Sequence, residues 1–498
     1  MNGRTPDVVI VGGGFGGIAA GVKLLAAGIR TFTIVEKSDG IGGTWWDNTY
    51  PGAEVDVVSH LYSYSFKRND WTRTHARRDE LQRYLEGVVD DYGLRPHFRL
   101  KTKVERAVWD ERSRRYVVHL DNGELLTANV LISAVGLLNH PNHPDWPGLD
   151  DFEGLKFHTA RWRHDVDLTG MRVAVVGTGS TAVQLVPEIA PIVKQLYLFQ
   201  REPGWIVPKG ERDFTPEERA GLRRPLQRRI ERLKKFWLLE RNLWGGAIYR
   251  PGTKVNTMRE QQCRAYIERE FADRPELRDA VTPGYPYPGK RPIFHSTFYS
   301  ALKRDNVELV PRAVASVTPT GIVDVDGVER EIDVLIIATG FKAAEYLPDL
   351  EVVGVDGRTI HEVWDGEPYA FLGITVPGFP NFFMLYGPNT NGGEIVFFLE
   401  RQSEYAVRVA KRIARGRVSA VEVRRSWTDL YNRWLQSRMK GTSWQSCRNY
   451  FTAASGRIVT QWPYGALVYG AMAKVLGPPS EFGRVAVRQP APEPVPVA

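Results

Sequence analysis

Cysteine is scarce in this chain. Only Cys263 and Cys447 occur among 498 residues, far apart and with no Cys-x-x-Cys pair. Two cysteines cannot build a disulfide framework, and their scarcity indicates the reducing cytoplasm. A redox dithiol of the disulfide-reductase kind needs two neighbouring thiols, so we do not expect that chemistry.

Long apolar runs are also absent. No stretch of about 18 apolar residues occurs, so we expect no membrane span. An apolar strand is predicted almost at the N-terminus, which leaves no room for a secretory leader and makes cytoplasmic localisation the expectation. Because His, Cys and carboxylate residues do not cluster at ligand spacing, no metal site is predicted.

Acidic residues do not balance the basic ones, and the net charge is +8. Much of the excess lies in residues 223–241, where Leu226, Ile230, Leu233 and Trp237 recur at helical spacing. We interpret this segment as a packed helix with a solvated basic face, and we predict no nucleic-acid partner. A contact with a membrane surface or a partner remains the alternative.

Two glycine fingerprints are present. Residues 12–17 read Gly-Gly-Gly-Phe-Gly-Gly after an apolar run, and residues 177–182 read Gly-Thr-Gly-Ser-Thr-Ala after a second one. Each predicts a strand, a tight turn and a helix whose free N–H groups bind a pyrophosphate. We therefore predict an α/β fold with two Rossmann-like dinucleotide-binding domains. The expected phosphate-side residues are Gly12, Gly14, Gly17, Gly177, Gly179, Ser180 and Thr181.

The residues that follow the two fingerprints at equal spacing differ in charge. Glu36 ends one predicted strand and can accept a hydrogen bond from a ribose 2′-hydroxyl. Arg201 follows the other strand, where a guanidinium would bind a 2′-phosphate that a carboxylate would repel. This difference predicts FAD in the first site and NADPH in the second.

Glycine and proline residues that interrupt the predicted strands and helices indicate the order of the domains. Apolar strands run into glycine at residues 130–136 and 334–340, and Thr215 looks like the N-cap of a charged helical segment. The predicted division is an FAD-binding domain at 1–150 and 341–483, an NADPH-binding domain at 151–208 and 289–340, and a helical insertion at 209–288. Residues 484–498 are rich in proline and are predicted to be a disordered tail.

Two further motifs identify a family. Residues 152–162 fit the pattern Phe-x-Gly-x-x-x-His-x-x-x-Trp, with His158 and Trp162 at its end, and residues 42–56 run from Gly-Gly-Thr-Trp-Trp to Asp56. Both resemble the signatures of type I Baeyer–Villiger monooxygenases, which are class B flavin-dependent monooxygenases. Trp162 favours this branch, because relatives that oxidise nitrogen or sulfur usually carry Tyr or Phe there. Arg163 departs from the Pro or Asp that is usual in the family.

The resemblance implies a reaction and a catalytic pair. NADPH reduces FAD, O₂ forms a C4a-peroxyflavin, and the peroxide attacks a ketone to give an ester or lactone. It places Arg291 beside the flavin, where it stabilises negative charge, and Asp56 behind it. An exposed structural ion pair is the alternative for these two residues. For the whole protein, an N- or S-oxygenating monooxygenase and a sensing flavoprotein remain open.

The resemblance also implies roles for residues outside that pair. Lys290 would contact the 2′-phosphate of NADPH together with Arg201, and Trp444 would lie on a mobile loop over the nicotinamide. His158 is interpreted as a hinge or positioning residue rather than a proton carrier. Three residues are expected near FAD, with core packing as the alternative for the two aromatic ones: Thr44, Trp45 and Tyr62.

Overall fold

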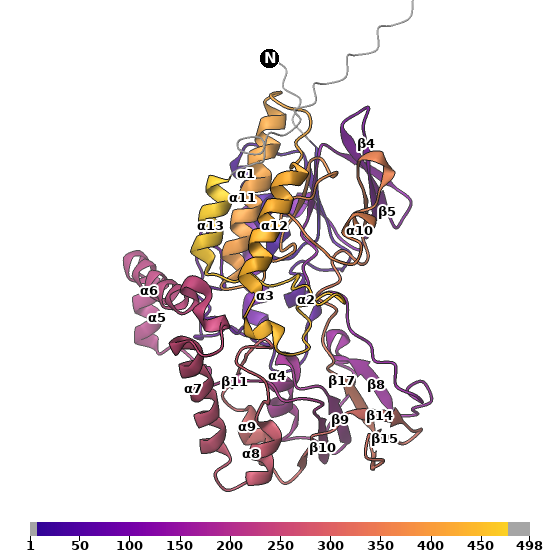
Figure 1. Ribbon diagram of the computed structural model, residues 1–498, viewed down its shortest axis with the longest axis vertical. Coiled ribbons are helices and arrows are strands. Elements are labelled where there is room, and N and C mark those ends of the chain that lie inside the picture. Colours follow the sequence, from indigo (N-terminus) through magenta and orange to yellow (C-terminus); the bar gives the residue numbers. More distant parts are fainter. Residues whose placement is uncertain (1–6, 477–498) are drawn as a thin grey trace, which may run out of the picture.

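A computed structural model describes residues 7–476 (Figure 1). Two five-stranded parallel sheets lie at opposite ends of the long axis, and helices flank both. This arrangement confirms the predicted α/β fold with two dinucleotide-binding units. The predicted tail at 484–498 lies outside the described residues.

The first sheet contains strands from both halves of the sequence. Its order is β19-β7-β1-β2-β3, and all of its pairs are parallel. Alternate residues of β1 face two different cores: Val8 and Ile10 face helices, whereas Val9 and Val11 face a smaller sheet. Burial on both faces explains why these strands are continuous apolar runs. The strands are β1 (Val8–Val11), β2 (Phe32–Val35), β3 (Phe98–Arg99), β7 (Val130–Ser133) and β19 (Phe382–Met384).

Three helices lie together on one face of this sheet. Helix α1 (Phe15–Ala26) contacts α11 (Ile395–Ala414), which in turn contacts α13 (Ala466–Val475). The opposite face carries the four-stranded sheet β18-β4-β5-β6. Its strands are β4 (Val104–Asp110), β5 (Arg115–Leu120), β6 (Leu125–Ala128) and β18 (Glu351–Val353).

The second parallel sheet has the order β13-β10-β9-β17-β8. Strand β9 is buried on both faces, since Val173 and Val175 belong to one core cluster and Ala174 and Val176 to another. Helices α4 (Ser180–Ile189) and α9 (Phe298–Leu302) contact each other beside it. Its strands are β8 (Leu155–His158), β9 (Arg172–Val176), β10 (Gln195–Phe199), β13 (Val307–Val310) and β17 (Val334–Ile337). An antiparallel sheet adds β14 (Val314–Val317), β15 (Gly321–Asp324) and β16 (Glu329–Glu331).

A helical segment is inserted between β11 (Ile206–Val207) and β12 (Ile293–Phe294), which pair with each other. It starts at the predicted N-cap, where Thr215 and Glu218 form a reciprocal capping box. The predicted helical insertion is therefore present, while the residue boundaries of the domains stay a prediction. Its elements are α5 (Pro216–Arg223), α6 (Pro225–Leu243), η3 (Trp244–Tyr249), α7 (Lys254–Glu270) and α8 (Pro275–Val281).

Eight further helices complete the described part of the chain. They are α2 (Thr44–Asp47), α3 (Arg78–Asp91), α10 (Ile360–Trp364), α12 (Arg425–Met439), η1 (Arg95–His97), η2 (Thr159–Arg161), η4 (Val355–Gly357) and η5 (Ser443–Gln445). Among residues 7–476, no helix combines the length and the apolar content that crossing a bilayer requires.

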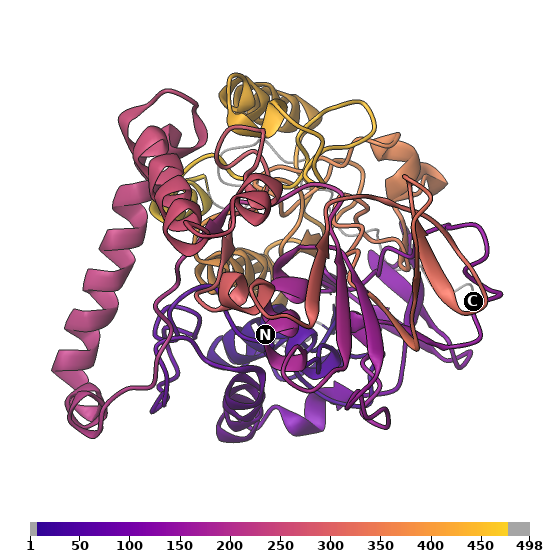
Figure 2. The same cartoon turned by 90° about the horizontal axis from the view of Figure 1, so that it is seen from below.

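One expectation about the insertion is wrong. The apolar stripe of α6 was expected to face the protein, but it faces solvent: Leu226, Leu233 and Trp237 are 71%, 56% and 56% exposed. The helix packs through a different face, which carries Phe236, Leu239 and Leu243. Figure 2 shows α6 as the long helix at the left edge of the molecule.

Candidate active site

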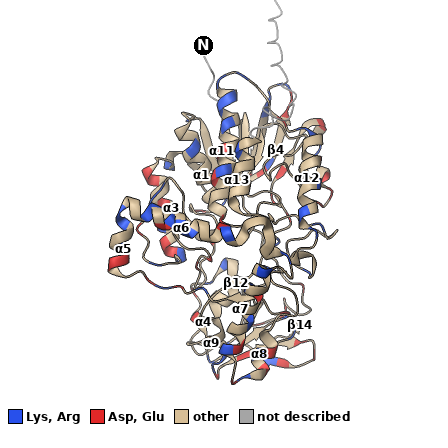
Figure 3. Cartoon of the chain, turned by 60° about the vertical axis from the view of Figure 1, so that its left-hand side comes forward, with Lys and Arg blue, Asp and Glu red and all other residues tan. Residues whose placement is uncertain are grey.

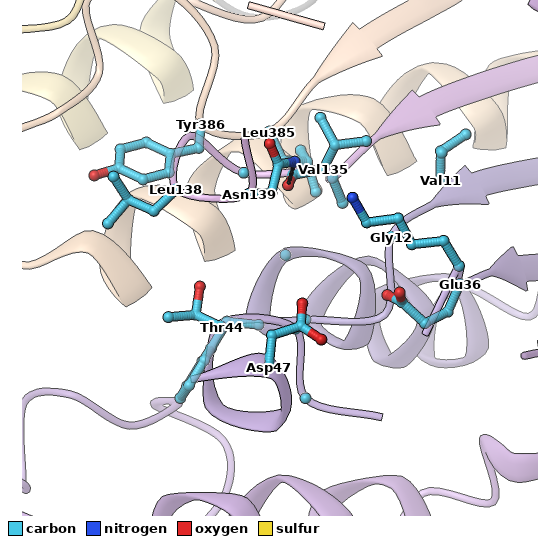
Figure 4. Close-up of a pocket in the computed structure, with 18 of the residues that line it drawn as sticks. Val11, Gly12, Glu36, Thr44, Asp47, Val135, Leu138, Asn139, Leu385 and Tyr386 are labelled. Carbon is cyan, nitrogen blue, oxygen red and sulfur yellow. Dashed lines mark hydrogen bonds between the residues drawn. The ribbon is translucent and has the colours of Figure 1, made fainter. Parts of the chain in front are cut away.

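A deep cleft opens at the carboxyl ends of the first sheet, where parallel sheets usually bind ligands (Figure 4). It has about 1240 Å³ of empty space, its open mouth included. Six of the predicted FAD-site residues line it together: Gly12, Gly14, Glu36, Thr44, Trp45 and Tyr62. Gly17 instead lies under the turn, where an added Cβ would stand 1.9 Å from the Gly12 carbonyl oxygen.

Glycine is required where the two walls of this cleft meet. Gly12 has φ = +107°, and a Cβ there would lie 2.6 Å from the Ala134 carbonyl oxygen. A Cβ on Gly43 would lie 2.9 Å from the Gly14 Cα, so two glycine turns touch backbone to backbone. Because Gly14 is the N-cap of α1 and has no side-chain cap, the helix N-terminus stays open to a phosphate.

Two backbone N–H groups hold the Glu36 side chain in place at the cleft. Its carboxylate accepts hydrogen bonds from the Gly13 N–H at 2.6 Å and the Ser38 N–H at 2.8 Å. Burial raises the pKa of Glu36, and the two backbone donors oppose that shift. A carboxylate fixed at the end of β2 has the position that ribose recognition requires.

Two aromatic side chains, Trp45 and Tyr62, line the cleft and contact each other. The Trp45 indole donates a hydrogen bond to the Tyr62 hydroxyl at 3.3 Å, and their rings meet edge to face. Burial raises the pKa of Tyr62 to about 12, so its hydroxyl stays protonated at neutral pH. Both residues thus contact each other as well as the cleft.

The sequence reasoning missed several residues that line this cleft, among them Asp47, Asn139 and Tyr386. Tyr386 follows the edge strand β19 with φ = 64°, and its N–H donates to Gln402. Asp47 lies within the motif at residues 42–56 and accepts a hydrogen bond from the Ser38 hydroxyl at 2.9 Å. Asp47 could have been found, because it lies within a motif already singled out, whereas Tyr386 reaches the cleft only through the pairing of β19 with β7.

The second fingerprint repeats the geometry of the first. Gly177 has φ = +116°, and a Cβ there would lie 2.5 Å from the Ala338 carbonyl oxygen. Gly179 is the N-cap of α4, which begins with Ser180 and Thr181. The helix N-terminus therefore has no side-chain cap of its own and is open to an anion.

Two basic side chains lie near this turn. Arg201 is exposed and makes no hydrogen bond or ion pair with another described residue. Lys290 forms an ion pair with Glu202, the residue next to Arg201, which places the two cations on neighbouring parts of the surface. A free guanidinium beside a lysine is suited to a phosphate monoester.

Arg291 and Asp56 meet between the two sheets. The Arg291 Nη2 donates to the Asp56 Oδ2 at 2.8 Å, and the Asp56 side chain is 10% exposed against 42% for Arg291. Burial opposes the charge of Arg291, but the Asp56 carboxylate raises its pKa above the ordinary value, so the guanidinium is permanently charged. Burial raises the pKa of Tyr62 and of Tyr386, which both line the cleft, and the charge of Arg291 opposes part of that rise.

The segment that carries Asp56 also contacts the second nucleotide unit. The Tyr50 hydroxyl donates to Gln184 of α4 at 2.9 Å, and a Cβ on Gly52 would lie 2.4 Å from the Gln184 carbonyl oxygen. Asp56 and Arg291 are thereby placed at the junction of the two units.

His158 and Trp162 lie at the end of β8, away from the described cleft. His158 is 3% exposed, and its Nδ1 accepts the Ala160 N–H at 3.1 Å. Burial, with a contribution from the charge of His143, lowers the pKa of His158 to about 4. Trp162 packs edge to face on Phe157 with ring centroids 5.2 Å apart. These contacts suit a positioning role, which stays a prediction.

Trp444 is enclosed rather than exposed. It is 3% exposed and its ring centroid lies 4.3 Å from that of Tyr249 in the insertion. The Ser443 hydroxyl donates to the Tyr287 carbonyl oxygen at 2.7 Å, and the Asn449 side chain donates to that of Gly289 at 3.1 Å. The loop therefore contacts the chain just before Arg291. Residues 7–476 contain no cluster of three or more metal-ligating side chains.

Comparisons with known proteins agree with this architecture. Residues 9–215 match the family model described as pyridine nucleotide-disulphide oxidoreductase. The chain is 40% identical over 462 residues to a Baeyer-Villiger monooxygenase of Streptomyces coelicolor, covering 92% of this chain and 88% of the relative. A Baeyer-Villiger monooxygenase of Pseudomonas aeruginosa is 39% identical, with the same coverage.

Solved structures are similar over nearly the whole chain. A cyclohexanone monooxygenase with bound epsilon-caprolactone has a TM-score of 0.86 and 32% identity, covering 97% of this chain and 99% of its own. OTEMO in complex with FAD and NADP has a TM-score of 0.86 and 27% identity, covering 95% and 98%. The extent of these similarities shows that the chain belongs to the Baeyer–Villiger monooxygenases, a family of FAD- and NADPH-dependent flavoproteins.

Proposed function

We propose that this chain oxidises a ketone to an ester or lactone with NADPH and O₂. FAD fits the first cleft, because Gly12, Gly14 and Gly43 clear the space beside an open helix N-terminus and Glu36 stands at the end of β2. NADPH fits the second turn, since Arg201 and Lys290 offer cations to a 2′-phosphate. Bound FAD, once reduced, supplies the activated oxygen.

The ion pair between Arg291 and Asp56 is the observation that carries the proposal. Conversion of a ketone to an ester passes through negative charge on the carbonyl oxygen of the ketone. A guanidinium that cannot lose its proton stabilises that charge, and the 2.8 Å contact with Asp56 holds it in one orientation. A guanidinium carries five N–H donors and the contact with Asp56 uses one of them at Nη2, so donors remain for the substrate.

The surroundings of Arg291 support the same role. The charge of Arg291 acts on Tyr62 and Tyr386, which line the cleft, and the Trp444 loop contacts the chain just before Arg291. The Arg291 side chain is 42% exposed in the structure, so bound cofactor and substrate would have to exclude water from it, which would strengthen its interaction with the reacting oxygen. The ion pair of Arg291 and Asp56 lies at the junction of the two nucleotide units, where both cofactors would meet the substrate.

Two variants test the proposal. Arg291→Ala should lower ester formation from a panel of cyclic, aromatic and linear ketones by at least about 100-fold, as removal of one charge-stabilising donor does. Anaerobic reduction of bound FAD by NADPH should change by less than about threefold. Arg291→Lys is the matched control, because it keeps the charge and loses the planar fork. Unchanged ester formation by Arg291→Ala would refute the assignment.

N- or S-oxygenation is the competing function. It does not require a cation beside the reacting oxygen, so Arg291→Ala should spare sulfide oxidation if the site has that activity. If the wild type oxidises only sulfides or amines and no ketone, the competing function is correct.

A further inference from the structure

The outer face of α6 is an amphipathic surface that the proposed reaction does not use. Leu226, Ile230, Leu233 and Trp237 follow one another at helical spacing and fall within an arc of about 60° at 100° per residue. All four are exposed, by 71%, 42%, 56% and 56%. Trp244, just beyond the helix, is 65% exposed. We call the five side chains the outer stripe.

The outer stripe is not a by-product of a loose helix. The inner face of α6 is bound to the first unit: the Arg232 guanidinium donates to the Ser63 hydroxyl at 3.1 Å, and Phe236 lies 5.6 Å from the Phe397 ring. Glu240 is 1% exposed and accepts the N–H groups of Ala466 and Leu467 at the start of α13. The helix therefore holds a fixed orientation that points its apolar stripe outward.

The concentration of apolar surface is local. Six of the sixteen large apolar side chains exposed in residues 7–476 lie between Leu226 and Trp244. Exposed apolar residues scattered singly need no explanation, whereas a contiguous row marks an interaction surface.

Basic side chains border the outer stripe on both sides. By helical position Arg229 lies along one edge, and Lys234 and Arg241 lie along the other. Helix α6 contains six Lys or Arg and two Glu, a formal charge of +4, which is half of the chain's +8. Figure 3 shows the basic segments of α6 on the outside of the molecule.

The positive charge of α6 indicates which kind of partner binds the outer stripe. A second copy of the chain would bring another +4 helix against the first, and like charges would oppose that contact. An anionic phospholipid surface accepts the outer stripe between its acyl chains, and its headgroups pair with the flanking cations. We propose that α6 docks the protein on an anionic membrane surface, with Trp237 and Trp244 at the depth of the headgroups.

Vesicle sedimentation of the FAD-loaded protein tests this without using turnover. Vesicles with about 30% phosphatidylglycerol in phosphatidylcholine should sediment the protein, and vesicles of phosphatidylcholine alone should bind it at least about tenfold more weakly. Raising the salt from about 0.05 M to 0.5 M should weaken the binding, because salt screens the headgroups.

Variants of exposed side chains separate the apolar contribution to vesicle binding from the electrostatic one. Leu233→Gln/Trp237→Gln should lower the vesicle partition at least about 30-fold through lost apolar burial. Lys234→Gln/Arg241→Gln should lower it roughly 10- to 30-fold, about fivefold for each charge. Leu430→Gln and Arg415→Gln change exposed residues of the same kinds elsewhere and should leave the partition unchanged. The flavin content of every variant reports that it is folded.

A second readout locates the contact. Lipids brominated on their acyl chains should quench tryptophan fluorescence of the wild type. Trp237→Phe/Trp244→Phe keeps apolar side chains, so it should still sediment but show less quenching. Three results would overturn the proposal: no binding to anionic vesicles, equal binding to neutral ones, or a dimer in sedimentation velocity that Leu233→Gln/Trp237→Gln abolishes.

Discussion

A buried ion pair joins the insertion to the segment that carries Asp56, and it gives a sharp stability prediction. The Lys209 Nζ lies 2.5 Å from the Glu54 Oε1, with side chains only 1% and 8% exposed. Arg73 contacts the other carboxylate oxygen of Glu54 at 3.3 Å and also pairs with Asp213. Glu54→Gln leaves the buried Lys209 charge without the carboxylate that contacts it directly.

The magnitude follows from this geometry. Removing one partner of a buried pair costs about 3–5 kcal/mol, because the other charge stays desolvated. At roughly 2.1 cal/mol/K per residue, the unfolding entropy of the chain is about 1 kcal/mol/K, so we expect Tm to fall by about 3–5 °C. Lys209→Met should cost less, since Glu54 keeps Arg73 as a partner.

Thermal unfolding at one scan rate, followed by circular dichroism and by flavin fluorescence, measures both shifts. Asp213→Asn is the matched control: its carboxylate also pairs with Arg73, but it is 75% exposed and should cost no more than about 1 kcal/mol. The reasoning fails if Glu54→Gln lowers Tm no further than Asp213→Asn does. It also fails if Lys209→Met in the Glu54→Gln background does not recover part of the loss, because that variant removes the stranded charge.

Two more predictions concern NADPH selectivity and pH. Arg201→Ala should raise the KM for NADPH by about 10- to 100-fold, because the contact with the 2′-phosphate is lost, and should leave the KM for NADH nearly unchanged. An equal rise in KM for both cofactors would contradict the assignment of Arg201. Burial and the His143 charge lower the pKa of His158 to about 4, so the unfolded chain binds a proton below pH 6.5 that the folded chain does not, and stability falls as pH drops. His158→Asn is the control, because it keeps an acceptor for the Ala160 N–H but does not titrate. Denaturant titrations should show that the free energy of unfolding of the wild type falls by about 1.5 kcal/mol relative to His158→Asn between pH 6.5 and 5.0. Parallel pH profiles of the two proteins would contradict this prediction.

The local sequence was sufficient to predict the structure of a short segment where its residue types allow only one backbone conformation. A strand followed by glycine and a helix, as at Val8–Val11 and Arg172–Val176, needs positive φ and space for a phosphate, and the structure shows both. The N-cap at Thr215 was equally readable, because its capping box involves only four residues. The proximity of Arg291 and Asp56 came from a family resemblance and not from spacing, since 235 positions separate them.

Contacts between distant segments were not readable in this way. Tyr386 lines the cleft only because β19 pairs with β7, and the buried pair of Glu54 with Lys209 exists only because the insertion folds back on residue 54. The periodicity of α6 identified an apolar stripe but not its partner, because a helical pattern is the same whether the stripe faces a core or solvent.

The sequence by itself determined the two nucleotide-binding turns, the charge difference between Glu36 and Arg201, and the family. Each of these depends on residue type at fixed local spacing, which the backbone cannot alter. Only the tertiary structure decided which α6 face is buried, which side chains close the cleft, and that Arg291 reaches Asp56 at 2.8 Å. Those outcomes depend on how the two sheets and the insertion pack against one another, and many sequences with the same local patterns could pack differently.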